Sequence, residues 1–177
     1  MTGALRRPVA LRAGADLALV APASGFDRAG FDAGVAELRA LGFVPRWDDR
    51  VFARDGYVAG AAAARAAALD EAWQDPSVAG LIGVRGGYGS VQVLPHLDPD
   101  RFTNRTPAFV GYSDLTSILT FLVCRCGTVA FHGPTVAGRI GRGADGYDRD
   151  SFLRVLTTAS PLGGIMPATQ ARAGDTA

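Results

Sequence analysis

Ser113 is the residue whose setting most favours covalent chemistry. The apolar run 108–111 precedes it, and an amphipathic segment begins at Asp114. A serine on a tight strand-to-helix turn projects from the sheet edge, and the first helix amides point at the same space. This setting suits a nucleophile, although Leu115 replaces the last glycine of the full nucleophile-elbow pattern. The alternative is that Ser113 only caps the following helix.

A glycine-rich loop, residues 85–89, is the second candidate element. It follows the apolar run 78–84 and reads Arg-Gly-Gly-Tyr-Gly. Glycines adopt positive φ easily and allow the backbone to approach a ligand closely. Amides of this loop, together with the amide of Asp114, could donate to a developing oxyanion. A tight turn that binds no ligand is the alternative.

The two histidines carry weaker signals. His132 comes at the end of a predicted strand and could act as a general base, but a bond to a backbone group is the commoner role. His96 reads as a loop residue. Residues 141–146 match the dinucleotide pattern formally, yet no strong strand leads into them and no acidic residue follows about 20 positions later. We expect a surface loop there, no metal site and no cofactor.

Strand-like and helix-like segments alternate along the chain. Apolar runs predict strands, and helical spacing predicts helices, at 17–21 (strand), 31–41 (helix), 43–47 (strand), 60–73 (helix), 78–84 (strand), 90–94 (helix), 108–111 (strand), 114–125 (helix), 128–131 (strand) and 151–156 (helix). This alternation predicts an α/β fold, a mostly parallel sheet flanked by helices of the flavodoxin-like or Rossmann-like kind. Ligands bind beyond the carboxyl ends of such strands. The residues expected there are Ser24, the 85–89 loop, Ser113 and His132.

Composition argues against nucleic acid and membranes as binding partners. The 177 residues include 18 basic and 17 acidic side chains, and this balance gives no basic stripe for nucleic acid. No apolar run is long enough for a membrane span, and no signal peptide is visible. Cys124 and Cys126 are expected to be two small buried hydrophobes, which fits a reducing compartment. We therefore expect a cytoplasmic protein.

Four segments together resemble the N-terminal domain of the LD-carboxypeptidases, a family that includes muramoyltetrapeptide carboxypeptidases and microcin C immunity peptidases. They are 20–24 (Val-Ala-Pro-Ala-Ser), 57–60 with Arg65, Asp70 and 75–78, the 85–89 loop, and 110–116 followed by 132–134 (His-Gly-Pro). Their order and spacing agree with the family from about Leu17 to about Leu156.

The resemblance implies a serine peptidase that cleaves the amide between an L-configured centre and a terminal D-alanine of murein peptides. It implies that Ser113 is the nucleophile. It assigns the oxyanion hole to the backbone amides of Asp114 and Gly87, with Gly86 as the alternative to Gly87. It also implies that Arg85, Tyr88 and Ser24 contact the substrate.

One departure from the family is visible. The family's other catalytic residues, a glutamate and a histidine, lie in a C-terminal domain, and neither residue type follows Ala159 here. We expect residues 1–158 to form the nucleophile domain and residues 159–177 a linker-like or disordered tail, with the C-terminal catalytic domain absent. Such a chain would be weakly active or inactive alone, and it would expose an apolar patch where that domain packs.

Three other readings remain open from the sequence. The domain could be a non-catalytic module that binds a peptide or a D-amino acid. It could be a half-enzyme completed by a second chain. In any of these cases it could assemble as a homodimer. It could also be an unrelated flavodoxin-like protein that binds a nucleotide or flavin.

Overall fold

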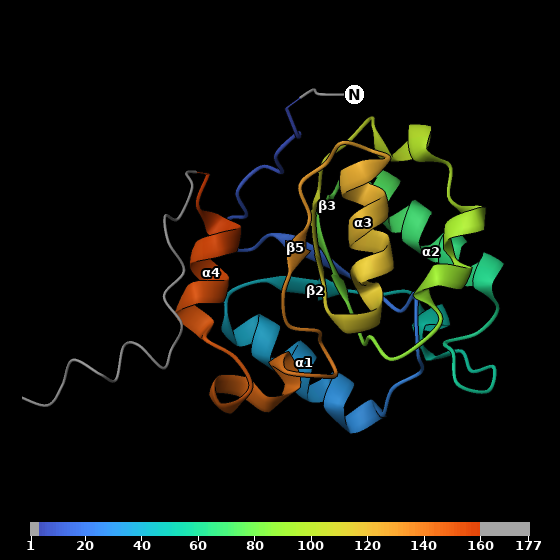
Figure 1. Cartoon of the computed structure of the whole chain (residues 1–177). Coiled ribbons are helices and arrows are strands. Elements are labelled where there is room, and N and C mark those ends of the chain that lie inside the picture. Colours follow the sequence, from blue (N-terminus) through green and yellow to red (C-terminus); the bar gives the residue numbers. More distant parts are fainter. Residues whose placement is uncertain (1–3, 160–177) are drawn as a thin grey trace, which may run out of the picture.

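A five-stranded parallel sheet forms the centre of the protein (Figure 1). The computed structural model describes residues 4–159. The strands are β1 (Asp16–Val20), β2 (Val44–Arg46), β3 (Val78–Gly83), β4 (Ala108–Gly111) and β5 (Phe131–His132), in the spatial order β2-β1-β3-β4-β5. All four strand pairs are parallel. The α/β fold with a parallel sheet is therefore confirmed.

Helices cover both faces of the sheet and give three layers. Helices α1 (Arg28–Ala40) and α4 (Arg149–Thr157) pack on one face, and α2 (Ala62–Gln74) and α3 (Thr116–Cys124) pack on the other (Figure 1). Strand β1 is continuously apolar because both of its faces are buried. Leu17 and Leu19 enter the core beneath α1, whereas Ala18 and Val20 enter the core beneath α2. Successive strand residues point to opposite faces, and both faces are buried here.

The strand order places a topological switch between β1 and β3. The chain leaves β1 toward β2 on one side and later enters β3 on the other, so the loops that follow β1 and β3 diverge. Crevices for ligands form at such points in open parallel sheets. Ser24 follows β1 and the 85–89 loop follows β3, so both lie at this crevice.

Two boundaries differ from the sequence prediction near the site. The fifth strand is Phe131–His132 rather than 128–131, because Thr128 forms an isolated bridge with Arg6 of the N-terminal segment instead of pairing with β4. His132 thus lies within the strand and pairs with Gly111. The segment after β4 begins with a 3₁₀ turn, Ser113–Leu115, before α3.

Short 3₁₀ segments supply much of the remaining structure. They are Asp49–Phe52, Ser90–Gln92, Leu94–His96, Pro99–Phe102 and Ile140–Asp145, besides the turn at Ser113. The last of these contains most of the glycine-rich stretch 141–146. It packs against α1, where Gly141 approaches the carbonyl oxygen of Gly30. That stretch is thus part of the helical layer on the α1 face.

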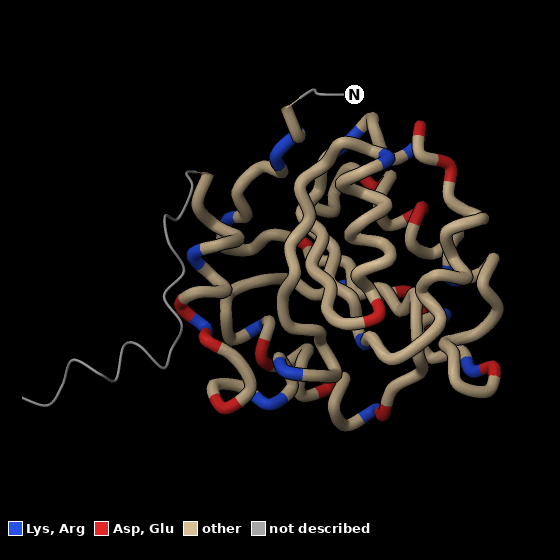
Figure 2. The backbone as a smooth tube through the Cα atoms, viewed as in Figure 1, with Lys and Arg blue, Asp and Glu red and all other residues tan. Residues whose placement is uncertain are grey.

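Basic and acidic residues are interspersed along the folded backbone rather than grouped by sign (Figure 2). No helix within residues 4–159 is long and apolar enough to cross a membrane. The cysteine prediction is half wrong: Cys126 is buried but Cys124 is exposed, and the two are not joined by a disulfide. Burial raises the pKa of the Cys126 thiol to about 11. Residues 160–177, which hold nearly all of the predicted tail, lie outside the described residues.

Candidate functional site

Ser113 sits in a strained backbone turn at the end of β4. Its φ of 58° is the single positive value among the non-glycine residues described. Such a conformation is costly for a residue with a Cβ, and it is concentrated at functional sites. Ser113 is exposed, and the N-cap position of the 3₁₀ turn belongs to Tyr112. The alternative role of Ser113 as a helix cap is therefore wrong.

The glycine loop lies directly against this turn. A Cβ added to Gly86 would stand 2.7 Å from the carbonyl oxygen of Tyr112 and 3.2 Å from the Cβ of Ser113. Gly87 has a φ of 96°, and a Cβ there would collide with the hydroxyl of Ser24. Only glycines allow the loop to approach Ser113 this closely. The structure thus brings together the serine turn and the glycine loop.

Ser90, which the sequence analysis did not single out, ties the loop to the turn. It is fully buried. Its amide donates to Oδ2 of Asp114 at 2.9 Å, and its hydroxyl donates to the Asp114 carbonyl at 2.6 Å. The same hydroxyl lies 2.7 Å from the hydroxyl of Ser117. The position of Ser90 directly after the glycine loop was the available sequence signal for this role. Its hydrogen-bond partners could not be predicted from the sequence, because they lie 24 and 27 positions away.

Arg65 is a buried cation that holds three loops around the site. Its guanidinium donates only to neutral acceptors, namely the carbonyl oxygens of Pro22, Gly60 and Gly89 and the side-chain oxygen of Gln92. Burial lowers the pKa of Arg65, and the charges of Asp114 and Asp55 act in the opposite direction. The loop after β1 and the glycine loop are therefore fixed to α2.

The Ser24 side chain bonds mainly to the backbone of the glycine loop. Its Oγ accepts a hydrogen bond from the amide of Tyr88 at 2.9 Å and lies 3.3 Å from the Tyr88 carbonyl oxygen. Ser24 is buried, with 7% of its surface exposed. The side chain thus shapes the loop and presents one edge to the neighbouring cavity.

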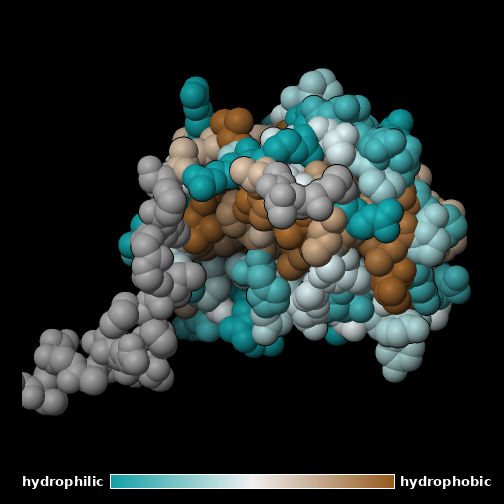
Figure 3. All heavy atoms as spheres, turned by 45° about the horizontal axis from the view of Figure 1, so that its top comes forward, coloured by the Kyte–Doolittle hydropathy of each residue, from teal (hydrophilic) through white to brown (hydrophobic). Residues whose placement is uncertain are grey.

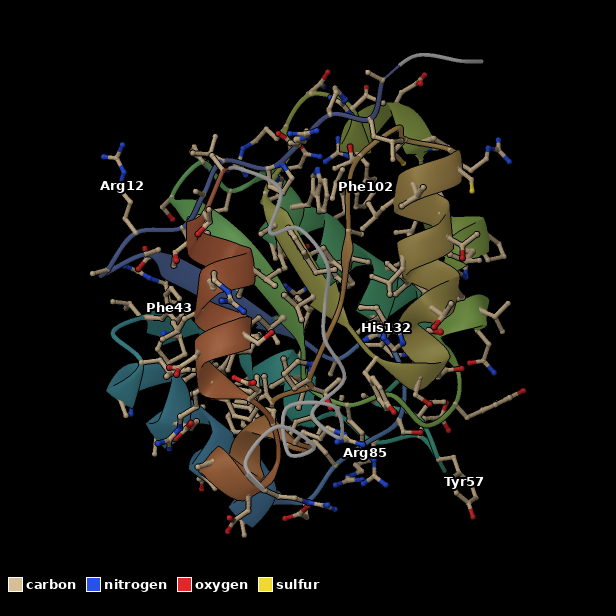
Figure 4. All side chains as sticks on the ribbon, turned by 60° about the vertical axis from the view of Figure 1, so that its left-hand side comes forward. Arg12, Phe43, Tyr57, Arg85, Phe102 and His132 are labelled. Carbon is tan, nitrogen blue, oxygen red and sulfur yellow. The ribbon has the colours of Figure 1, made fainter. Side chains whose placement is uncertain are left out.

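A cavity of about 690 Å³ adjoins the glycine loop on its β1 side. Its lining residues are Ser24, Gly25, Arg54, Gly56, Tyr57, Arg85, Gly87 and Tyr88. Arg85 and Tyr57 lie at the same end of the molecule, opposite the end that carries Phe102 (Figure 4). Tyr57 and Tyr88 are 85% and 58% exposed, so two aromatic rings stand in solvent beside this cavity.

His132 does not contact Ser113 by any hydrogen bond within residues 4–159. It is exposed, and its ring centroid lies 5.0 Å from that of Tyr112. No carboxylate orients it in the described part of the chain, as a general base of a triad requires. His96 lies in the 3₁₀ segment Leu94–His96 and is exposed. Between residues 4 and 159, no three His, Cys, Asp or Glu side chains are grouped to hold a metal ion.

Comparison with known proteins agrees with this arrangement. Residues 17–133 match the LD-carboxypeptidase N-terminal domain. The murein tetrapeptide carboxypeptidase of Pseudomonas aeruginosa is 35% identical over 145 residues, which are 81% of this chain and 47% of that protein. The muramoyltetrapeptide carboxypeptidase of Oxalobacter formigenes superposes with a TM-score of 0.72 at 25% identity, covering 81% of this chain and 48% of that one.

A microcin C7 self-immunity protein has the same fold. Its structure in complex with aspartyl sulfamoyl adenosine superposes with a TM-score of 0.81 at 24% identity, covering 87% of this chain and 48% of that one. The present chain spans less than half the length of the curated relatives it matches. The matched region contains both the serine turn and the glycine loop, and the chain therefore belongs to the LD-carboxypeptidase family, through that family's N-terminal domain.

Proposed function

We propose that this domain supplies the nucleophile and the oxyanion hole of a serine-type LD-carboxypeptidase, which hydrolyses the amide to the terminal D-alanine of murein peptides. The observation that carries the proposal is the positive φ of Ser113 beside the glycine loop. A strained serine turn between a strand and a helix is the geometry of nucleophile elbows. The murein tetrapeptide carboxypeptidase relative supports the substrate class.

The roles follow from what each group can do. The Ser113 hydroxyl attacks the carbonyl carbon of the scissile amide. The amide of Asp114 and an amide of the glycine loop, from Gly87 or Gly86, donate to the oxygen as negative charge develops on it. Preorganised donors of this kind stabilise the transition state because they need no rearrangement during the reaction. Ser90 and Arg65 hold these donors in place.

The general base comes from outside the described residues in this proposal. A serine hydroxyl is a weak nucleophile at neutral pH without a base, and the family keeps its glutamate and histidine in the C-terminal domain. Residues 4–159 offer no base bonded to Ser113. We therefore expect these residues alone to show at most the ~10³–10⁴-fold catalysis over water that binding and an oxyanion hole provide. The C-terminal domain, in this chain or in a partner chain, restores full activity.

The test is release of D-alanine from a murein tetrapeptide. It is measured with the chain alone and with the separately produced C-terminal domain of a relative. We expect release in the mixture that is lost in Ser113→Ala and kept in Ser151→Ala, a serine on α4 far from the site. Equal rates for the wild-type chain and Ser113→Ala, each mixed with an active C-terminal domain, would contradict the proposal.

A second candidate is a peptide-binding module without turnover. It is favoured by one observation, a formed cavity beside the glycine loop, while Ser113 has no bonded base within residues 4–159. Binding of the tetrapeptide with no D-alanine release, even in the presence of the C-terminal domain, would select this candidate. We infer a cytoplasmic location, supported by the free cysteines, and a homodimer is an assembly to look for by light scattering.

A further inference from the structure

Residues 132–139 begin at the carboxyl end of β4, where the chain enters the serine turn. His132 pairs with Gly111 in the sheet, and the amide of Gly133 donates to the Gly111 carbonyl oxygen at 2.9 Å. Gly111 is the last residue of β4, and Ser113 lies two positions further along the chain. The segment therefore fixes β4 at the point where the strand ends and the turn begins.

The same segment then crosses to β3, where the glycine loop begins. The amide of Val136 donates to the carbonyl oxygen of Gly83 at 3.2 Å, and the amide of Ala137 donates to that of Val84 at 2.9 Å. Val84 is followed directly by the 85–89 loop. The Val136 side chain is fully buried. One short segment thus bonds to both strands at the points where the two loops of the site leave them.

The Tyr112 side chain connects this segment to the serine turn. Its ring centroid lies 5.0 Å from that of His132, and the guanidinium carbon of Arg139 lies 5.6 Å from the Tyr112 ring centroid. A guanidinium at this distance is attracted to the π face of the ring. The first and the last residue of the segment therefore both contact the residue that directly precedes Ser113.

The conformation of Ser113 needs support from both sides. A positive φ in a residue with a Cβ is unfavourable, and it persists only where the surrounding structure holds it. On the C-terminal side of Ser113, Ser90 bonds to Asp114. On the N-terminal side, the Tyr112 carbonyl oxygen accepts a hydrogen bond from the Leu115 amide at 3.2 Å, and the Tyr112 ring packs on the segment. Both neighbours of the strained residue are thus held.

We propose that residues 132–139 form a positioning brace, which sets the distance between the Ser113 hydroxyl and the amides of the glycine loop. In this proposal His132 and Arg139 act through the Tyr112 ring and touch no reacting atom. The effect on turnover rests on the function proposed above, whereas the hold on the turn is a property of the folded domain. The role of His132 then depends on its ring and not on its proton.

The first test needs no activity. It measures hydrogen exchange of the Leu115 amide by NMR, because the bond from this amide to the Tyr112 carbonyl closes the turn. We expect Tyr112→Ala and His132→Ala to speed this exchange roughly 3- to 10-fold, as the loss of one aromatic contact allows, and Arg139→Ala to speed it less. His96→Ala, at an exposed histidine away from the turn, keeps the wild-type rate. Unchanged exchange of the β1 amides establishes that every variant is folded.

The second test is D-alanine release in the presence of the C-terminal domain. We expect His132→Ala to lower kcat roughly 10-fold with little change in KM, because the serine is displaced and the binding surface is kept. His132→Phe should restore most of the lost kcat, since a phenyl ring packs on Tyr112 without a titratable nitrogen. His96→Ala should match the wild type.

Three outcomes would overturn the brace. They are unchanged Leu115 exchange in both His132→Ala and Tyr112→Ala, a His132→Ala enzyme with full kcat, and equal losses of kcat in His132→Phe and His132→Ala, which would indicate a general base instead. If the wild-type mixture releases no D-alanine, the proposed function fails. Faster Leu115 exchange in His132→Ala would still support the brace in that case, and unchanged exchange would remove it.

Discussion

The two ends of the sheet both carry an arginine-lined cavity, but only the carboxyl end also carries a strained serine turn among the described residues. The cavity at the amino end measures about 540 Å³ and is lined by residues 9–15, 76–79 and 105–107. Figure 3 looks toward this end, where apolar surface shows between hydrophilic side chains. Arg105 there donates to the carbonyl oxygens of Trp73, Asp75 and Val78. The Arg12 side chain in the same cavity forms no hydrogen bond or ion pair within the described residues. At the carboxyl end the same is true of the Arg85 side chain, whereas Arg54 donates to the carbonyl oxygen of Phe26.

The comparison shows that an arginine-lined cavity does not by itself identify a site in this fold. A guanidinium whose donors are bound to backbone carbonyls stabilises a loop and offers little to a ligand. A guanidinium with free donors beside a strained serine is available for recognition. The carboxyl end has both features, together with glycines that leave no space for a side chain.

The largest expected effect is on Gly86. In Gly86→Ala, the new Cβ would stand 2.7 Å from the Tyr112 carbonyl oxygen and push the loop from Ser113. Loss of one oxyanion donor lowers kcat by about 10²–10³. The matched control is Gly14→Ala at the amino end, a positive-φ glycine with open space around it. Gly14→Ala should lower stability but leave the rate of D-alanine release unchanged. The rate of D-alanine release in the complemented assay is measured for both variants. An equal fall in this rate for Gly86→Ala and Gly14→Ala would contradict the distinction between the two ends of the sheet.

Arg65→Met should have the next largest effect. It leaves three buried carbonyl oxygens and one amide oxygen without their donor. We expect a loss of roughly 3 kcal/mol in the free energy of unfolding, measured by urea denaturation, and slower D-alanine release in the complemented assay. Arg105→Met should cost about 1–2 kcal/mol, because its carbonyl acceptors are nearer to solvent, and should leave D-alanine release unchanged. Slower D-alanine release in Arg105→Met would show that the two ends are coupled.

Ser90→Ala sharpens the comparison within the carboxyl end. It removes a buried hydroxyl that bonds to Asp114 and Ser117, and we expect a loss of about 1–2 kcal/mol in stability. Turnover in the complemented assay should fall while KM changes little, because the Asp114 amide shifts. Ser77→Ala, whose exposed hydroxyl bonds to Asp75, should change neither quantity measurably. A Ser90→Ala enzyme with unchanged kcat would mean that the 3₁₀ turn holds its position without this contact.

The smallest effect is the pH response of a structural ion pair far from the site. Hydrogen bonds from Arg149 and Tyr147 hold the pKa of Glu37 below its ordinary value of 4.5. The resulting stability is present above that value and is lost as the pH falls through the lower folded pKa. Because Arg149 is 45% exposed, solvent screening keeps this contribution small. The thermal midpoint of Glu37→Gln should therefore fall less steeply on acidification than that of the wild type.

Much of the fold could be predicted because its signals are local. Buried parallel strands are apolar along their whole length, so β1, β3 and β4 are visible in the sequence as runs. The serine turn after β4 and the glycine loop after β3 could also be predicted, because each directly follows an apolar run and the loop contains three glycines. The fifth strand was misplaced because a contact between Thr128 and Arg6, distant in sequence, decides where pairing begins.

The sequence by itself determined the alternation of strands and helices, the family, and the identity of Ser113 and the glycine loop as candidates. Only the tertiary structure decided which residues surround them. The positive φ of Ser113, the contact of Gly86 with the serine turn and the bonds of Ser90 depend on the packing of β3 beside β4. Arg54 lies in an irregular segment without periodicity, and it reaches the cavity because the order β2-β1-β3 folds that segment back over the end of β1. Local patterns record what a segment can form, whereas a site assembled from separate loops exists only after the sheet has brought their ends together.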